Sequence, residues 1–363
     1  MSRFFALLLT LALTQAAHAQ NVYEILREQG QGFAAVVPGL ELRFPRDHGI
    51  HPSFRIEWWY ITANLVDTQG RHWGLQWTLF RQALSPVPDT RGWNSNQLWM
   101  AHAALTTPQF HRFEQRFARG GIGQAGVSDI RRDGFFDAWI DDWQWRSEGA
   151  ALFPSVLHFD VGGRQVQMQL NSSADWVLHG EGGYSQKSAQ GQASYYYSQP
   201  QIQIQGTVSG AGEDISLSGV AWLDREWSSQ ALAPNQSGWD WFSLHLDDGN
   251  KLMLYRLRQD DGAHWLSASW INGRGETRQL SPSEIELEPG PTNRIDIGAG
   301  KQIEIPLEWT LKLPAQGLNL SIKALYDQQW MATRYPYWEG VVTVKNSAGL
   351  SVGKGYMELT GYD

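Results

Sequence analysis

The sequence contains no cysteine in its 363 residues. Disulfide bonds are therefore excluded, and a structural zinc site, which usually relies on thiolate ligands, is not expected. The fold must be stabilised by the burial of apolar side chains, which suits a large fold better than a small one. The length exceeds what one ordinary domain needs, so the chain is expected to form two domains.

Charge is also scarce. Charged residues make up 18% of the chain, with 29 basic against 37 acidic residues and no basic run, so no surface for DNA or RNA is expected. The H-E-x-x-H motif of zinc proteases is absent, and the one match to the G-x-S-x-G pattern of hydrolase nucleophiles, residues 349–353, precedes a short alternating segment and not the helix that a nucleophile elbow requires. We therefore predict neither a metal nor a cofactor.

Long apolar runs are missing after the first twenty residues. The chain begins MSRFFALLLTLALTQAAHAQ, in which one arginine precedes an apolar run that ends before an Ala-His-Ala sequence. This pattern predicts a secretory signal peptide, residues 1–19, that is cleaved near Ala19, because the run is too short to cross the roughly 30 Å core of a bilayer. We expect the mature protein to be soluble and periplasmic or secreted.

Short segments of alternating apolar and polar residues recur along the chain. Examples are residues 54–66, 72–82, 157–170 and 251–259, and they are separated by turns rich in Gly, Asn, Asp and Pro. Many short strands of this kind predict an all-β fold of antiparallel barrels or sandwiches, with little helix.

One sequence pattern occurs twice, half the chain apart. WWYITANLVDTQG, from Trp58, aligns with WDWFSLHLDDG, from Trp239, and the two share W-x-aromatic-x-[TS]-x-[NH]-L. A repeat of this kind predicts two similar domains. The turn-rich segment 198–201 is the expected boundary, which gives domains of residues 20–200 and 201–363.

Strand periodicity divides each copy of the repeat into two faces, because successive side chains point to opposite sides of a strand. One face is aliphatic, and the other combines large rings with polar groups. Such a mixed face either lines a pocket for an organic ligand or is an outer face covered by a loop or by the other domain. The mixed faces carry Trp58, Tyr60, Thr62 and Asn64 in the first copy and Trp239, Trp241, Ser243 and His245 in the second.

Two closely spaced acids lie between the copies, in GVAWLDREWSSQ. On a strand, Asp224 and Glu226 share one face with Trp222, and Arg225 lies on the other. Neighbouring carboxyl groups can raise each other's pKa, so that one stays protonated and acts as an acid. The alternative is a salt-bridged strand end.

Other acids lie beside aromatic residues. Glu57 falls on the packing face of its strand, and we interpret it as a structural ion pair with Arg55 or Arg81, because a carboxylate at the edge of such a face is rarely unpaired. The same interpretation applies to the acids near the C-terminus and the arginines expected near them, namely Glu339, Glu358, Arg256 and Arg258.

Five segments in this order resemble the AttH-like and hydroxyneurosporene synthase (carotenoid 1,2-hydratase) family. They are residues 57–82, 194–208, 219–230, 238–258 and 337–362. The resemblance implies two tandem lipocalin-like β-barrel domains. It also implies one of two roles, because some members are carotenoid hydratases and others are exported proteins associated with ABC-type export permeases.

For a hydratase, Asp224 would protonate an isoprenoid double bond, Glu226 would orient this acid or a water, and His245 would relay protons. Tryptophan and tyrosine faces would stabilise the carbocation, with Trp222 among them. However, the hydratase branch tends to have histidine in the motif where this chain has Arg225, and a permanent guanidinium between two acids favours their ionised forms.

The predicted export signal also argues against carotenoid synthesis, which takes place inside the cell. The sequence therefore favours an exported protein that binds or carries an apolar, lipid- or isoprenoid-like ligand and works with an ABC-type permease. A carotenoid 1,2-hydratase-like lyase is the alternative. The candidate ligand-binding residues are Trp58, Tyr60, Asn64, Trp222, Trp239 and Trp241.

Overall fold

The structure is a computed structural model that describes residues 24–28, 30–210 and 212–362; the predicted signal peptide lies outside this part. Strands make up most of the regular structure, and the α-helices found there are the single turns α1 (Glu24–Arg27) and α2 (Ile130–Asp133). Among the described residues, no helix is long and apolar enough to span a membrane. The predicted all-β fold is confirmed. Short 3-10 turns lie at Arg46–His48, Gly92–Asn94, Pro282–Glu284 and Pro314–Gln316.

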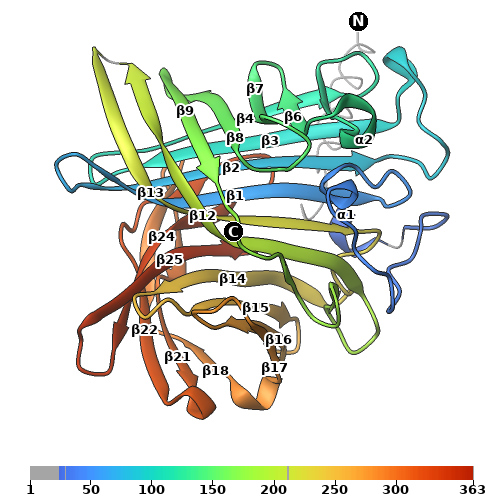
Figure 1. The fold of residues 1–363 in the computed structure, drawn as a ribbon. Helices are drawn as coiled ribbons and strands as arrows, with labels where there is room; N and C mark the ends of the chain where they lie inside the picture. Colours follow the sequence, from blue (N-terminus) through green and yellow to red (C-terminus); the bar gives the residue numbers. More distant parts are fainter. Residues whose placement is uncertain (1–23, 29, 211, 363) are drawn as a thin grey trace, which may run out of the picture.

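Two large antiparallel sheets form the molecule (Figure 1). The first has thirteen strands, and its main path runs in the order β4 (His111–Arg119), β3 (Gln97–Thr106), β2 (His72–Ala83), β1 (Ile56–Asp67), β13 (Glu213–Ser228), β12 (Ala193–Gly210), β9 (Arg164–Asn171), β8 (Ser155–Val161), β7 (Trp143–Ser147), β6 (Asp137–Ile140) and β5 (Ala125–Val127). Two short strands, β10 (Val177–Leu178) and β11 (Tyr184–Gln186), pair with β12 beside this path.

The second sheet has ten strands. Its main path runs in the order β17 (Thr277–Leu280), β16 (His264–Ile271), β15 (Lys251–Gln259), β14 (Gln236–Leu246), β25 (Ser351–Thr360), β24 (Tyr337–Asn346), β22 (Leu318–Ala324), β21 (Glu308–Leu313) and β18 (Glu286–Pro289), and β23 (Trp330–Met331) pairs with β24. A separate ribbon consists of β19 (Thr292–Gly298) and β20 (Lys301–Pro306).

The two sheets repeat one topology. β1 opens a meander of four strands and pairs on its other side with β13, and β14 does the same with β25. The two copies of the sequence pattern lie on β1 and β14, so they occupy equivalent places in the two sheets. Equivalent positions also face equivalent neighbours, because Tyr60 is opposite Asp224 and Trp241 is opposite Glu358.

The change from the first sheet to the second falls between Ser228 and Gln236, rather than at the expected boundary of residues 200 and 201. β12 runs through that boundary with a shift of register between Gln199 and Ile202. Pro200 lies inside this shift, and because proline has no backbone N–H to donate, it is tolerated in a strand at such an irregularity. What the sequence presents as a turn is a bulge in a long strand.

The interior of each barrel-like sheet is filled by side chains. The aliphatic face of β1 joins Trp77, Trp143 and Trp145 in one core, and Trp309 and Trp338 belong to the other. Each buried ring removes about 150–250 Å² of surface from water, and each Å² of buried apolar surface stabilises the fold by about 25 cal/mol. The largest contribution to stability therefore comes from the side chains inside the barrels. The outer faces of β1 and β14 do not belong to these two cores.

Candidate functional site

The mixed faces of the two repeats meet between the sheets. Tyr60 of β1 and Trp241 of β14 pack edge to face, with ring centroids 5.4 Å apart. Both belong to a third cluster, which also holds Tyr196, Trp222 and Tyr255. Both alternatives raised by the sequence are therefore partly right, because each face is covered by the other sheet and the two faces together line a cavity.

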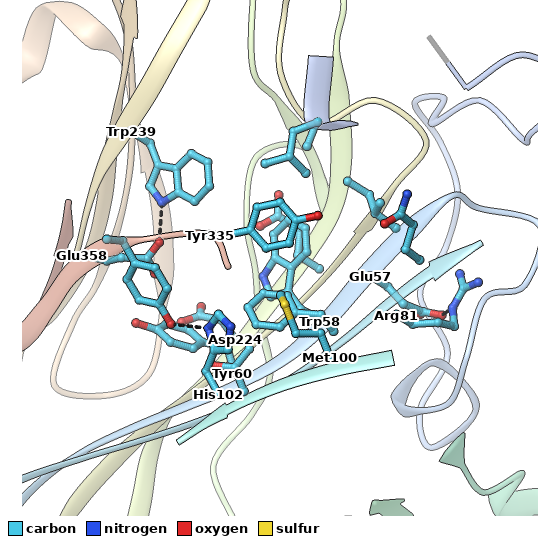
Figure 2. Close-up of a pocket in the computed structure, with 18 of the residues that line it drawn as sticks. Glu57, Trp58, Tyr60, Arg81, Met100, His102, Asp224, Trp239, Tyr335 and Glu358 are labelled. Atoms are coloured by element: carbon cyan, nitrogen blue, oxygen red, sulfur yellow. Dashed lines mark hydrogen bonds and ion pairs between the residues drawn. The ribbon is translucent and has the colours of Figure 1, made fainter. Parts of the chain in front are cut away.

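This cavity has a volume of about 270 Å³. Rings and aliphatic side chains form most of its wall, and a few carboxyl groups, Lys187, Arg81 and His102 complete it. Figure 2 shows many of these side chains around the cavity. Predicted site residues in the wall are Trp58, Tyr60, Asp224, Glu226, Trp239 and Trp241, together with Glu57 and Arg81, which were predicted as a structural ion pair. Residues that the predictions missed include Phe80, Met100, His102, Lys187, Tyr196, Tyr255, Tyr335 and Tyr337.

Asp224 is the deepest acid of the predicted pair and is only 2% exposed. Its Oδ1 accepts hydrogen bonds from the hydroxyls of Ser198 and Tyr196, the latter at 2.8 Å, and from the indole Nε1 of Trp222 at 3.1 Å. Its Oδ2 has no hydrogen-bond partner among the described residues. Burial raises the pKa of Asp224 to about 7, against the lowering effect of the three donors. When Asp224 is protonated, the proton is therefore expected on Oδ2, because the three donors occupy Oδ1.

Glu226 has a basic partner, unlike Asp224. The Lys187 Nζ lies 2.8 Å from its carboxylate, and Ser194 donates a second hydrogen bond. Lys187 also lies over the ring of Tyr255, 4.1 Å from the centroid. Burial alone would lower the pKa of Lys187, but the adjacent Glu226 carboxylate raises it. Lys187 and Glu226 therefore form a buried ion pair in the cavity wall.

Arg225 does not lie between the two acids, and the objection that it keeps both of them ionised was wrong. Its side chain points into the first barrel, where it pairs with Glu57 and lies over the ring of Trp59 at 3.8 Å. Alternation along β13 places a residue and its neighbours on opposite faces. The positive charge of Arg225 is thus directed away from Asp224.

Glu57 is completely buried and pairs with both Arg81 and Arg225. Burial would raise its pKa, but the two guanidinium groups hold it well below the usual range. Arg55, the other partner considered from the sequence, instead pairs with Glu28 at the surface. Glu57 therefore belongs to a structural ion network inside the barrel end.

A second acid centre lies on the second sheet. Glu339 and Glu358 are directly opposite each other on β24 and β25. Tyr60 donates a hydrogen bond to Glu339, and the Trp239 Nε1 donates one to Glu358 at 2.7 Å. Burial and the proximity of the two carboxyls raise the pKa of Glu339 well above its usual value, and burial raises that of Glu358 to about 7.

The arginines expected near these C-terminal acids have another partner. Arg256 pairs with Asp240 at 2.8 Å, and Arg258 pairs with the same carboxylate. The interpretation of Glu339 and Glu358 as arginine ion pairs was therefore wrong. Asp240 alternates with Trp239 and Trp241 along β14, so these guanidinium groups lie on the opposite face from the cavity.

Each sheet supplies a ring to the acid centre of the other. Tyr60 of the first sheet bonds to Glu339 of the second. In return, the Trp241 Nε1 of the second sheet donates to the Tyr196 hydroxyl at 3.0 Å, and Tyr196 donates to Asp224. The two acid centres are thus joined to the sheet–sheet contact by hydrogen bonds, which fix the positions of both.

Three of the predicted catalytic and ligand-binding residues lie outside the cavity wall. Trp222 is behind it, where its indole holds Asp224. Asn64 lies further along β1, opposite Val220. His245 is held by the Pro200 carbonyl at 2.7 Å, and burial lowers its pKa to about 4, so it is not placed to relay protons in the cavity.

The groups that the sequence missed carry weak signals. Tyr196 and Ser198 alternate in the segment YYYSQ, so they share a strand face, and Lys187 lies in a loop segment with no distinctive pattern. In the described part of the chain, no group of three or more His, Cys, Asp and Glu side chains is arranged to hold a metal ion. The site is therefore built from carboxyl groups, rings and the two ion pairs Lys187–Glu226 and Arg81–Glu57.

Comparisons with known proteins agree with this architecture. The model of the family described as AttH-like matches residues 35–362. An AttH protein of Nitrosomonas europaea has a crystal structure with 36% identity and a TM-score of 0.79, covering 91% of this chain and 100% of that one. No curated protein matched the chain.

Two more distant structures share the fold. Kievitone hydratase from Nectria haematococca has 14% identity and a TM-score of 0.66, covering 93% of this chain and 98% of its own. CghA, solved with Sch210972, has 12% identity and a TM-score of 0.54, with the same shares covered. The expected lipocalin-like fold of two barrel-like sheets is confirmed. From the family model and the Nitrosomonas relative, the chain belongs to the AttH-like family.

Proposed function

We propose that this protein binds an unsaturated apolar molecule in the cavity between its two sheets and adds water across a carbon–carbon double bond by acid catalysis. The observation that carries the proposal is Asp224, a dry carboxyl group in an aromatic cavity with one oxygen held by three donors and the other without a partner. Buried acids without a cation are costly for stability, and strongly perturbed acids in cavities are typical of catalytic sites.

The chemistry follows from the placement of these groups. The proton on Asp224 Oδ2 passes to one carbon of the alkene, whose π electrons form the new C–H bond and leave a carbocation on the other carbon. The faces of nearby rings such as Tyr60 and Trp241 stabilise the positive charge. A water oxygen then bonds to the cation and releases its proton to a cavity carboxylate, and exchange with solvent returns a proton to Asp224. General acid catalysis of this kind contributes about 10²–10⁴-fold to a rate.

The structural neighbours support the fold of this proposal. One of them is a hydratase by name, but at 14% identity the likeness concerns the fold alone. The reaction class proposed for this chain therefore rests on its own cavity and on Asp224.

The test is hydration in water enriched with ¹⁸O. Purified protein is incubated with a panel of acyclic carotenoids and shorter isoprenoid alkenes, and products are analysed by mass spectrometry for one added, labelled water. We expect Asp224→Asn to lower the rate by about 10²-fold or more, while Glu304→Gln, an exposed change on β20, leaves it unaltered. A fully active Asp224→Asn variant would show that the acid is another group.

A carrier that works with an ABC-type permease is the second candidate, favoured by the largely apolar wall of the cavity and by the export signal expected from the sequence. A carrier would return its ligand unchanged. Native mass spectrometry of protein taken from the periplasm, with an N-terminus following Ala19, would detect such a ligand. Binding without labelled product across the panel would favour this candidate over the hydratase.

A further inference from the structure

Five acids lie in the cavity wall or directly beside it, and three of them, Asp224, Glu339 and Glu358, have no basic partner among the described residues. Lys187 is engaged by Glu226 at 2.8 Å. Within the described ranges, no lysine, arginine or histidine lies at ion-pair distance from Asp224, Glu339 or Glu358. Buried carboxyl groups in this situation either hold protons or require a positive charge from outside the chain.

The acids differ in their access to the cavity. Asp224 is almost completely buried, whereas Glu358 and its partner Trp239 are half-buried and line the cavity. Figure 2 shows the Trp239 indole directed at the Glu358 carboxylate. Glu358 is thus the acid with more access to the cavity, beside aromatic rings, and Asp224 is the more deeply buried one.

We propose that Glu358, supported by Glu339 and Tyr60, binds an ammonium group, so that the molecule filling the cavity is an apolar amine. This inference rests on the proposed function, because it names the class of the molecule that occupies the same cavity. Rings such as Trp239 favour alkylated ammonium groups through their negative faces, and a carboxylate supplies the counter-charge.

The orientation of such a ligand follows from desolvation. An ammonium group loses less hydration beside the half-buried Glu358 than it would beside Asp224. The apolar remainder then extends among the rings towards Asp224, where the acid can reach a double bond. A carboxylate ligand would instead meet like charges, and a neutral ligand would leave the acids of the second sheet without a counter-ion.

Charge in the cavity makes the binding of a cation dependent on pH. The titratable groups facing Glu358 are Glu339 on β24, Tyr60 on β1, and Asp224 and Glu226 on β13, and Glu226 is paired with Lys187. Because the pKa of Glu358 is raised to about 7, its carboxylate forms as the pH rises through that value. Affinity for a cation should increase over the same range, with release of a proton at neutral pH.

Isothermal titration calorimetry with three matched eight-carbon compounds tests the inference. They are octyltrimethylammonium, whose charge is permanent, 1-octanol and octanoate. We expect the cation to bind at least about tenfold more tightly than the other two, which is about 1.4 kcal/mol. Repeating the titration in buffers of different ionisation enthalpy should reveal a proton released by the protein, since this ligand has none to lose.

Glu358→Gln should reduce the affinity for the cation to that for 1-octanol, and Glu304→Gln should not change it. If Glu358→Gln does not fold, titrations of the wild-type protein at several pH values provide the test. Of the three compounds, only the cation should bind more tightly above pH 7 than below it. Equal binding of cation and alcohol would overturn the ammonium site and leave the proposed hydration intact. Hydration of neutral alkenes with no preference for amines would also overturn the ammonium site and leave the proposed hydration intact. Failure of all ligands to bind would count against both the ammonium site and the proposed hydration.

Discussion

Replacing Asp224 with asparagine should flatten the dependence of stability on pH. Burial raises the pKa of this group from 3.8 to about 7. The folded chain therefore binds more protons than the unfolded chain between these values, and the free energy of unfolding falls as the pH rises through this window. Asparagine keeps much of the shape of the side chain but cannot ionise, so the variant escapes this loss.

The size of the effect can be worked out from the shift. One pKa unit corresponds to about 1.4 kcal/mol, and the interval from about pH 5 to the folded pKa of about 7 covers two units. The wild-type protein should thus lose about 3 kcal/mol through Asp224 between about pH 5 and pH 8. Relative to the wild type, Asp224→Asn should gain this amount over the same interval, whatever the cost of the substitution at pH 5.

Denaturant unfolding at several pH values, followed by tryptophan fluorescence, measures this difference. The acids Glu339 and Glu358 remain in both proteins, so most of their contribution to the pH dependence cancels in the comparison. Glu304→Gln provides a matched control, because it makes the same type of change in an exposed pair with Arg294. Parallel pH curves for wild type and Asp224→Asn would refute the reasoning that Asp224 is protonated in the folded protein.

Two further predictions concern the other buried acids. Glu57→Gln should destabilise the fold by about 3–5 kcal/mol, because it leaves the buried charges of Arg81 and Arg225 without compensation. Arg55→Ala should cost less than about 1 kcal/mol, since its pair with Glu28 is at the surface. Equal losses of the two variants in denaturant unfolding would contradict the buried ion network of Glu57. Tyr60→Phe should lower the free energy of unfolding by about 1–3 kcal/mol, because it removes a hydrogen-bond donor to the buried Glu339 carboxyl. This loss, measured by denaturant unfolding, should increase with pH as the carboxyl ionises. A loss independent of pH would mean that the Tyr60 hydroxyl has no ionisable partner.

The fold was predictable because its signals are local. The alternation in IEWWYITANLV assigns Trp59 and Ile61 to one face and Tyr60 to the other, and the structure places these in the barrel core and in the sheet contact. The equivalence of Trp58 and Trp239 was visible for the same reason. What covers the second face depends on the position of the other sheet, and strand periodicity carries no information about that.

The pairing of Glu339 with Glu358 in the second acid centre could not be predicted from the sequence. β24 and β25 form a hairpin, and Lys345 pairs with Ser351 next to the turn. Counting outward from this pair places Glu339 opposite Met357, on the wrong face. On β25, Val352 is an extra residue between Ser351, which pairs with Lys345, and Gly353, which pairs with Val344, and it shifts the register so that Glu339 meets Glu358. The two acids come together because of this irregularity, which has no distinctive residue type to mark it.

The position of the site follows from how the barrels use their interiors. Lipocalin-like barrels can hold a ligand inside, but here tryptophans and aliphatic side chains fill both interiors. The cavity lies instead where the outer faces of β1 and β14 meet, and it reaches Trp99 at the end of the first barrel. Neither sheet alone would complete an acid centre, since Tyr60 reaches Glu339 and Trp241 reaches Asp224 through Tyr196. The contact between the sheets thus sets both the shape of the cavity and the position of Asp224 relative to Glu358. A substitution that loosens this contact should therefore impair both acid centres together, whereas one inside either barrel should act mainly on stability.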